Sequence, residues 1–163
     1  MQQKVYLLLG SNQGNREKYL QDAESMIEER IGSIIKRSSV YETEPWGFND
    51  KRYFLNQVLV VNTDQAPLQI LDNINKIESE LGRKRTHSGH YSNRLIDIDI
   101  LFYGNQLLSS EELSIPHPLI QERRFVLLPM EEIAPDFEHP QLRKTISLLL
   151  KECADQLEVR KYR

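Results

Sequence analysis

The chain has 163 residues with 39% hydrophobic and 28% charged residues, which is ordinary for a globular protein and long enough for one domain with a real core. One cysteine leaves no partner for an internal disulfide and fits a reducing compartment. No apolar run approaches the roughly 20 residues that cross a bilayer, and the N-terminus has no signal-peptide pattern. We therefore expect residues 1–163 to form a single cytoplasmic domain without a membrane partner.

Apolar periodicity and turn residues predict alternating strands and helices along the first two-thirds of the chain. Asn15 can cap the first helix, which Gly32 follows, and Pro67 suits the first turn of the second helix, before Gly82. In chain order the expected elements are a strand at 4–9, a helix to about residue 30, strands at 33–41 and 53–62, a helix from 67 to about 81, and a strand at 94–103.

The order β-α-β-β-α-β predicts an α+β fold with a ferredoxin-like core, a mostly antiparallel sheet and both helices on one face. Gly104 and Asn105 are expected to turn the chain into a short hairpin partner. Helical patches near 125–133 and 143–157 complete the expected C-terminal part, a hairpin and helices. This fold serves many functions, so it does not predict the chemistry.

Asp97 and Asp99 lie in the strand-like segment 94–103, which is otherwise mostly apolar and β-branched. Side chains two residues apart on a strand point to the same face, with Cα atoms roughly 6–7 Å apart. Two neighbouring buried carboxylates are costly unless a cation neutralises them. The pair predicts a site for Mg²⁺, although the solvated face of an amphipathic strand is the simpler alternative.

A basic segment precedes this strand: residues 81–96 contain Arg83, Lys84, Arg85 and Arg94 and no acidic residue. Cations beside two carboxylates suit a polyphosphate, which metals bridge from one side and guanidinium groups from another. A solvated basic loop and a nucleic-acid patch are the alternatives. The short extent of the cluster and the net charge of −3 argue against nucleic acid.

Several motifs recur in a specific order along almost the whole chain. They are LLLGSNQGN near the start, YETEPWG at 41–47, FLN at 54–56, GR at 82–83, RLIDIDI at 94–100, IPHP at 115–118 and RRF at 123–125. Together they resemble the family of 6-hydroxymethyl-7,8-dihydropterin pyrophosphokinases. The resemblance implies transfer of the β,γ-pyrophosphoryl group of ATP to the pterin hydroxymethyl group, with release of AMP, in folate biosynthesis.

The resemblance also implies roles for individual residues in binding ATP and metal. Asp97 and Asp99 would hold two Mg²⁺ ions, and together with Arg83 and Arg94 they would be catalytic. The positions matched to ATP contacts are Glu78, Arg83, Arg85, Arg94, Ile100, His117 and Arg123. For Glu78 and His117, ordinary structural roles are nearly as well supported by the sequence alone.

The pterin site is implied separately. A flat heterocycle needs aromatic faces and a few donors and acceptors at its edge. Phe54 and Phe125 match the positions that sandwich the ring, and Asn56 offers both a donor and an acceptor. The full set matched to pterin contacts is Thr43, Pro45, Trp46, Phe54, Asn56, Tyr91 and Phe125. The polar loops at 44–52 and 83–93 flank this site and are expected to close over it.

Two other classes of protein stay open from the sequence. One is a different Mg²⁺-dependent phosphoryl or nucleotidyl transferase, and the other is a non-catalytic ferredoxin-like module that binds a small ligand. Asn56 with its two flanking phenylalanines argues against the first, and the arginines beside the aspartates argue against the second. We expect a monomer that binds ATP and the pterin but no nucleic acid.

Overall fold

The computed structural model describes residues 2–44, 53–82 and 95–163, and it contains a mixed α/β architecture with an antiparallel sheet. The elements are β1 (Gln3–Ser11), α1 (Arg16–Arg30), β2 (Ser33–Arg37), β3 (Tyr41–Thr43), β4 (Phe54–Thr63), α2 (Pro67–Glu80), β5 (Asp97–Tyr103), β6 (Leu108–Ser109), β7 (Ser114–Ile115), the 3-10 turn η1 (Ile120–Glu122), α3 (Arg124–Ile133), α4 (Ile146–Glu152) and β8 (Val159–Lys161).

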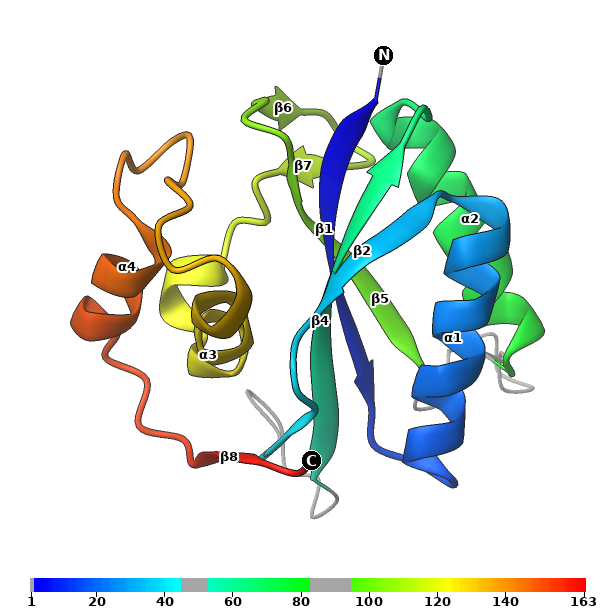
Figure 1. Ribbon diagram of the computed structural model, residues 1–163, viewed down its shortest axis with the longest axis horizontal. Helices are drawn as coiled ribbons and strands as arrows, with labels where there is room; N and C mark the ends of the chain where they lie inside the picture. The colour runs from blue at the N-terminus through cyan, green and yellow to red at the C-terminus, as the bar shows by residue number, and fades with distance from the viewer. Residues whose placement is uncertain (1, 45–52, 83–94) are drawn as a thin grey trace.

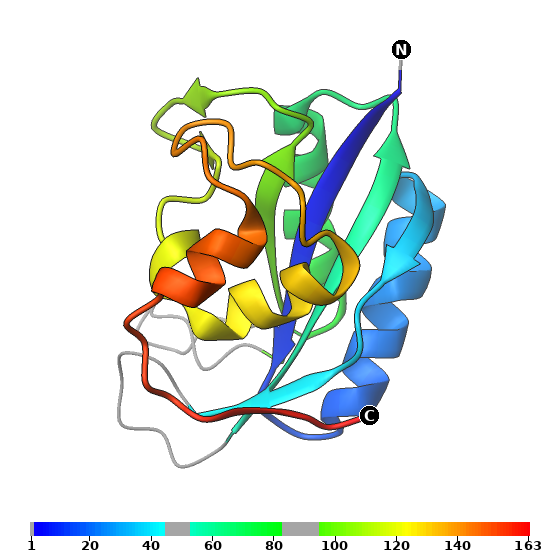
Figure 2. The ribbon, with the colours of Figure 1, turned by 60° about the vertical axis from the view of Figure 1, so that its left-hand side comes forward.

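The main sheet has the strand order β5-β1-β4-β3-β8, and β2 also pairs with β4. Neighbouring strands run antiparallel throughout. Helices α1 and α2 cover one face of the sheet, and α3 and α4 cover the other (Figures 1 and 2). The expected placement of the first two helices on one face is therefore confirmed. None of the helices in the described part of the chain could cross a membrane.

The two helical layers create a hydrophobic core on each side of the sheet. Side chains of β1 alternate between them: Leu7 and Leu9 pack with the α1 and α2 layer, whereas Tyr6 and Leu8 pack with the α3 and α4 layer. This two-sided burial explains why the first strand is an unbroken apolar run, because both of its faces are removed from water.

Both long helices begin where the sequence predicts. The side chain of Asn15 accepts a hydrogen bond from the backbone N–H of Lys18 at 3.1 Å, which satisfies a donor in the first turn of α1. Pro67 is the first residue of α2. Gly82 follows α2 with a φ of +111°, a conformation that favours glycine.

The single strand expected at 33–41 is wrong, because the chain forms two short strands there, β2 and β3. The interruption is at Ser38, whose backbone N–H donates to Val58 O and whose Oγ accepts from Val58 N, both at 2.9 Å. The register of β2 on β4 also shifts between Ile34 and Lys36. The serine side chain thus replaces a ladder bond and lets β3 take a new course along β4.

The C-terminal helix is shorter than the predicted 143–157. A turn with Arg143 at φ 58° precedes α4, Thr145 caps it, and the chain after Glu152 ends in the unpredicted strand β8. The expected hairpin partner after Gly104 also differs, because β6 pairs with β7. The pairing of β8 with β3 joins distant segments, which local periodicity does not reveal, whereas β6 and β7 form a short local hairpin separate from the main sheet.

Candidate functional site

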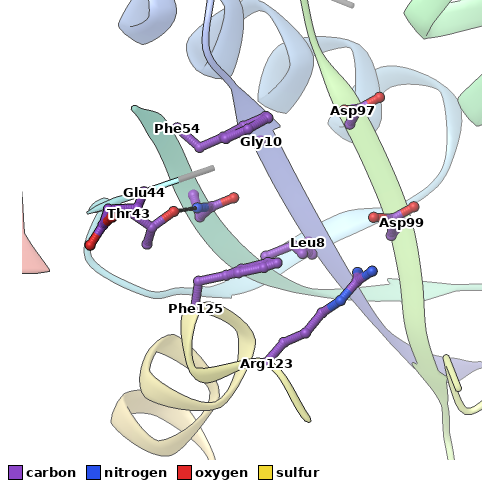
Figure 3. Close-up of a pocket in the computed structure, with 10 residues that line it drawn as sticks. Leu8, Gly10, Thr43, Glu44, Phe54, Asp97, Asp99, Arg123 and Phe125 are labelled. Atoms are coloured by element: carbon purple, nitrogen blue, oxygen red, sulfur yellow. Dashed lines mark hydrogen bonds between the residues drawn. The ribbon is translucent and has the colours of Figure 1, made fainter. Parts of the chain in front are cut away.

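A cavity of about 220 Å³ opens between the ends of β1, β3, β4 and β5 and the beginning of α3 (Figure 3). Its lining combines two aromatic rings, two aspartates, an arginine and a buried amide. The lining residues are Leu8, Gly10, Thr43, Glu44, Phe54, Asn56, Asp97, Asp99, Arg123 and Phe125. Seven of them are site residues predicted from the sequence.

Asp97 and Asp99 both line the cavity from β5, so they share a face of the strand as predicted (Figure 3). Ile98 between them is buried in the opposite core. Across the part of the chain that the structure describes, no group of three His, Cys, Asp or Glu side chains could hold a metal ion. A cation bound here would therefore need ligands in addition to these two carboxylates.

Two side-chain bonds fix the end of β5 that carries the aspartates. The carboxylate of Glu78 on α2 accepts a hydrogen bond from the backbone N–H of Ile98 at 2.8 Å, and this glutamate is only 3% exposed. The hydroxyl of Ser11 donates to the carbonyl of Leu95 at 2.6 Å. Glu78 thus contacts the strand between the two aspartates, and it does not line the cavity itself.

The aromatic rings of Phe54 and Phe125 approach the cavity from opposite sides (Figure 3). The buried amide of Asn56 also lines the cavity and donates from Nδ2 to Thr43 Oγ1 at 2.9 Å. This bond leaves the carbonyl oxygen and the second N–H of the amide as groups that can recognise a polar ring edge. Thr43 is paired with Phe54 in the β3–β4 ladder, so the backbone pairing fixes the position of Thr43 relative to Phe54.

Arg123 precedes α3 and extends toward Asp99 (Figure 3). Burial lowers the pKa of the Arg123 guanidinium, while Asp99 and Glu122 oppose that effect. His117 lies near this arginine, and burial together with the positive charge of Arg123 lowers its pKa to about 4. The Nδ1 atom of His117 accepts from the Leu119 N–H at 3.2 Å, so the neutral ring carries its proton on Nε2.

Ile100, which is also matched to an ATP contact, is 4% exposed, and its side chain packs in the α1 and α2 core. Any contact with a nucleotide would have to come from its main chain on the sheet-edge strand β5. The remaining predicted site residues lie outside the described residues: Pro45, Trp46, Arg83, Arg85, Tyr91 and Arg94. The proposed loop closures at 44–52 and 83–93 lie almost wholly there too.

Sequence reasoning missed Leu8, Gly10 and Glu44 as cavity residues. A Cβ atom on Gly10 would lie 3.0 Å from Asn56 Oδ1, so glycine allows this close approach of the amide. The available signal was the glycine directly after the expected strand at 4–9, but β1 continues through Ser11 and therefore includes it.

The mixed α/β architecture places a cavity lined by two aromatic rings next to a carboxylate pair. A sequence model of the 7,8-dihydro-6-hydroxymethylpterin-pyrophosphokinase family matches residues 6–135. The chain belongs to this family.

Individual relatives agree with that assignment. The chain is 42% identical over 139 residues to the 2-amino-4-hydroxy-6-hydroxymethyldihydropteridine pyrophosphokinase of Porphyromonas gingivalis, covering 84% of this chain and 94% of that protein. It is also 42% identical over 142 residues to the enzyme of that name from Aquifex aeolicus, covering 87% of each. The crystal structure of Plasmodium falciparum HPPK-DHPS with pteroate has a similar fold, with a TM-score of 0.78 and 20% identity over 93% of this chain, which spans 44% of that longer chain.

Proposed function

We propose that this protein transfers the β,γ-pyrophosphoryl group of ATP to the hydroxymethyl group of 6-hydroxymethyl-7,8-dihydropterin, forming AMP and the pterin diphosphate in folate biosynthesis. Family membership and the names of the relatives support this class of reaction. The observation that carries the proposal is the composition of one cavity, in which two aromatic rings and a buried amide adjoin two carboxylates and an arginine.

The aromatic half of the cavity suits the acceptor. Phe54 and Phe125 offer apolar faces to the two sides of a flat ring, and each contact is favourable by burial and stacking. Asn56 is held by Thr43, so its remaining amide groups are oriented for the aminopyrimidinone edge of a pterin. A ring bound between the phenylalanines would place its substituent close to the aspartates.

The carboxylate half suits a metal-bound polyphosphate. Mg²⁺ prefers oxygen ligands and is commonly bound by one or two carboxylates together with substrate phosphates, a pattern that Asp97 and Asp99 fit. We propose that these two residues hold two Mg²⁺ ions, which when bound would neutralise phosphate charge and orient the acceptor hydroxyl.

The neighbouring cations complete the ATP side. Arg123 lies beside Asp99 and would bind a phosphate oxygen with its planar guanidinium group. His117 is neutral at physiological pH and would donate its Nε2 proton to an oxygen of ATP. Glu78 would act by holding the backbone of β5, and Ile100 through its main chain. The ATP roles of Arg83, Arg85 and Arg94 and the pterin roles of Pro45, Trp46 and Tyr91 rest on the family resemblance.

The remaining parts of the proposal concern the chain as a whole. We propose that the strands β1, β2, β4 and β5 with α1 and α2 form a ferredoxin-like core, supported by the order β5-β1-β4-β2. We further propose that residues 1–163 act as one domain, as a cytoplasmic monomer that binds neither nucleic acid nor membrane.

A product assay tests the reaction directly. ATP and Mg²⁺ are incubated with the protein, with and without hydroxymethyldihydropterin, and the adenine nucleotides are separated by chromatography. The proposal predicts AMP that forms only when the pterin is present. Formation of ADP would indicate a monophosphoryl transferase, and the absence of any pterin-dependent nucleotide product would contradict the proposal.

A further inference from the structure

The C-terminal strand β8 covers the outer edge of β3, the three-residue strand that carries Thr43. Thr43 pairs with Phe54 on one side and with Val159 on the other. A strand this short has few bonds of its own, so its position depends on both neighbours. The chain after residue 152 thus contacts the wall of the cavity from outside, although it lies beyond residues 6–135 that match the family.

Side-chain contacts reinforce this pairing. Glu42, directly before Thr43, accepts hydrogen bonds from Arg160 Nη2 at 2.9 Å and Nε at 3.3 Å, and from Arg16 Nη1 at 3.1 Å. Arg16 also donates to the carbonyl of Tyr53, next to Phe54. Burial alone would raise the pKa of Glu42, but the two arginines outweigh it and lower the pKa. The Glu42 carboxylate, 15% exposed, therefore joins β8, β3 and the beginning of α1.

The same C-terminal segment also contacts the opposite wall of the cavity. The carboxylate of Asp155 accepts a hydrogen bond from the backbone N–H of Arg124 at 3.0 Å, at the first residue of α3. This bond satisfies one of the N–H groups that a helix leaves unpaired at its start. Arg124 stands between the cavity residues Arg123 and Phe125, so Asp155 fixes the helix end from which both project.

We propose that residues 155–160 act as a strap that sets the separation between the two walls of the acceptor pocket, with Asp155 and Arg160 as positioning residues. This inference rests on the proposed function, because it takes the pocket between Phe54 and Phe125 to be the pterin site. The strap bonds to the Thr43 and Phe125 walls, whereas Asp97 and Asp99 are held by Glu78 and β1. Loosening the β8 end of the strap should therefore weaken pterin binding and leave nucleotide binding unchanged. Loosening the Asp155 end also releases Arg123, so it should weaken binding of both ligands.

The test compares Arg160→Ala with a matched control, Arg37→Ala. Arg37 also lies in a sheet strand, forms an ion pair with Glu24, and is 52% exposed, compared with 57% for Arg160. Calorimetry measures the affinity for hydroxymethyldihydropterin and, separately, for a non-hydrolysable ATP analogue with Mg²⁺. We expect Arg160→Ala to weaken pterin binding about fivefold, the scale of one charge-assisted contact, and Arg37→Ala to change neither affinity.

Several further variants make the result specific. Asp155→Ala, at the other wall, should weaken pterin binding to a similar extent, and Arg160→Lys, which keeps the charge but loses the planar fork, should fall between wild type and Arg160→Ala. In a Glu42→Gln background, Arg160→Ala should add less than it does alone. Thermal melts establish which variants are folded. If Arg160→Ala does not fold, the affinities of Asp155→Ala and Arg160→Lys provide the test.

The outcomes separate the strap from the proposed function. A wild-type protein that does not bind the pterin would overturn both. If the wild-type protein binds the pterin and the folded strap variants bind it equally well, the strap is wrong and the proposed function stands. Equal weakening of pterin and ATP analogue by Arg160→Ala or Arg160→Lys would also overturn the strap, because it would indicate general destabilisation.

Discussion

The buried carboxylate of Glu78 accepts the backbone N–H of Ile98, the residue between Asp97 and Asp99. Strand β5 lies at the end of the described sheet and pairs there only with β1, so its outer N–H groups need partners from elsewhere. Glu78, from the last turn of α2, supplies one of them at 2.8 Å. A helix side chain thereby holds the strand that presents both aspartates to the cavity.

Replacing Glu78 should separate its hydrogen-bonding role from its charge. Glu78→Leu removes the acceptor for the Ile98 N–H and should lower the free energy of unfolding by about 1–3 kcal/mol. Glu78→Gln keeps an acceptor oxygen and should lose less. Turnover should fall in the same order, because Asp97 and Asp99 lose their fixed backbone. Urea denaturation and AMP release measure both effects, and a Glu78→Leu protein with wild-type stability and activity would contradict this role.

The aspartates themselves should be needed for turnover more than for folding. Asp97→Asn and Asp99→Asn each remove a charge that would bind Mg²⁺, and turnover should fall at least about a hundredfold, because a bound metal supplies several kcal/mol of charge stabilisation. Both side chains are partly exposed, so the free energy of unfolding should change by less than about 1 kcal/mol. The measurements are AMP release at saturating Mg²⁺ and urea denaturation. Near-wild-type turnover in either variant would exclude the metal assignment.

Asn56 should recognise the pterin and not the nucleotide. Asn56→Ala leaves polar atoms of the ring edge unpaired, a loss of about 1–3 kcal/mol or roughly tenfold to a hundredfold in pterin affinity. Affinity for an ATP analogue should not change. Asn75→Ala, an exposed asparagine on α2, is the control. Calorimetry with each ligand measures the effect, and equal weakening of both ligands would show that the pterin pocket lies elsewhere.

His117 should make stability depend on pH. Its pKa is about 4 in the folded chain and near 6.5 when unfolded, so the unfolded state binds more protons between these values. The free energy of unfolding should therefore fall as the pH drops from about 6.5 toward 4. His117→Asn, whose side-chain oxygen can still accept from the Leu119 N–H, should show a shallower decline. NMR titration gives the pKa directly, and an ordinary value near 6.5 would refute this prediction.

The sequence predicted the elements whose signals are local. Asn15 as a helix cap, Pro67 as a helix start and the shared face of Asp97 and Asp99 follow from rules that span a few residues. The division of 33–41 into two strands was not predictable, because it depends on Ser38 bonding to Val58 twenty residues away.

Long-range contacts also hold the walls of the candidate site, and these contacts could not be predicted from the sequence. The hydrogen bond from the Ile98 N–H to the Glu78 carboxylate joins a strand to a helix, and β8 pairs with β3 across more than a hundred residues. The sequence patterns of α2 and β8 do not indicate which strand each of them contacts. The proposed pterin and ATP residues were predicted from the ordered motifs of the family, since Phe54 or Phe125 alone would be interpreted as an ordinary core residue.

Phosphorus NMR of the wild-type reaction shows directly which phosphoryl group reaches the pterin. ATP, Mg²⁺, hydroxymethyldihydropterin and the protein are combined, and the phosphorus-containing products are identified as they form. We predict AMP and a pterin ester bearing two linked phosphates, in equal amounts. A pterin monophosphate with ADP, or AMP with free pyrophosphate and unmodified pterin, would contradict it.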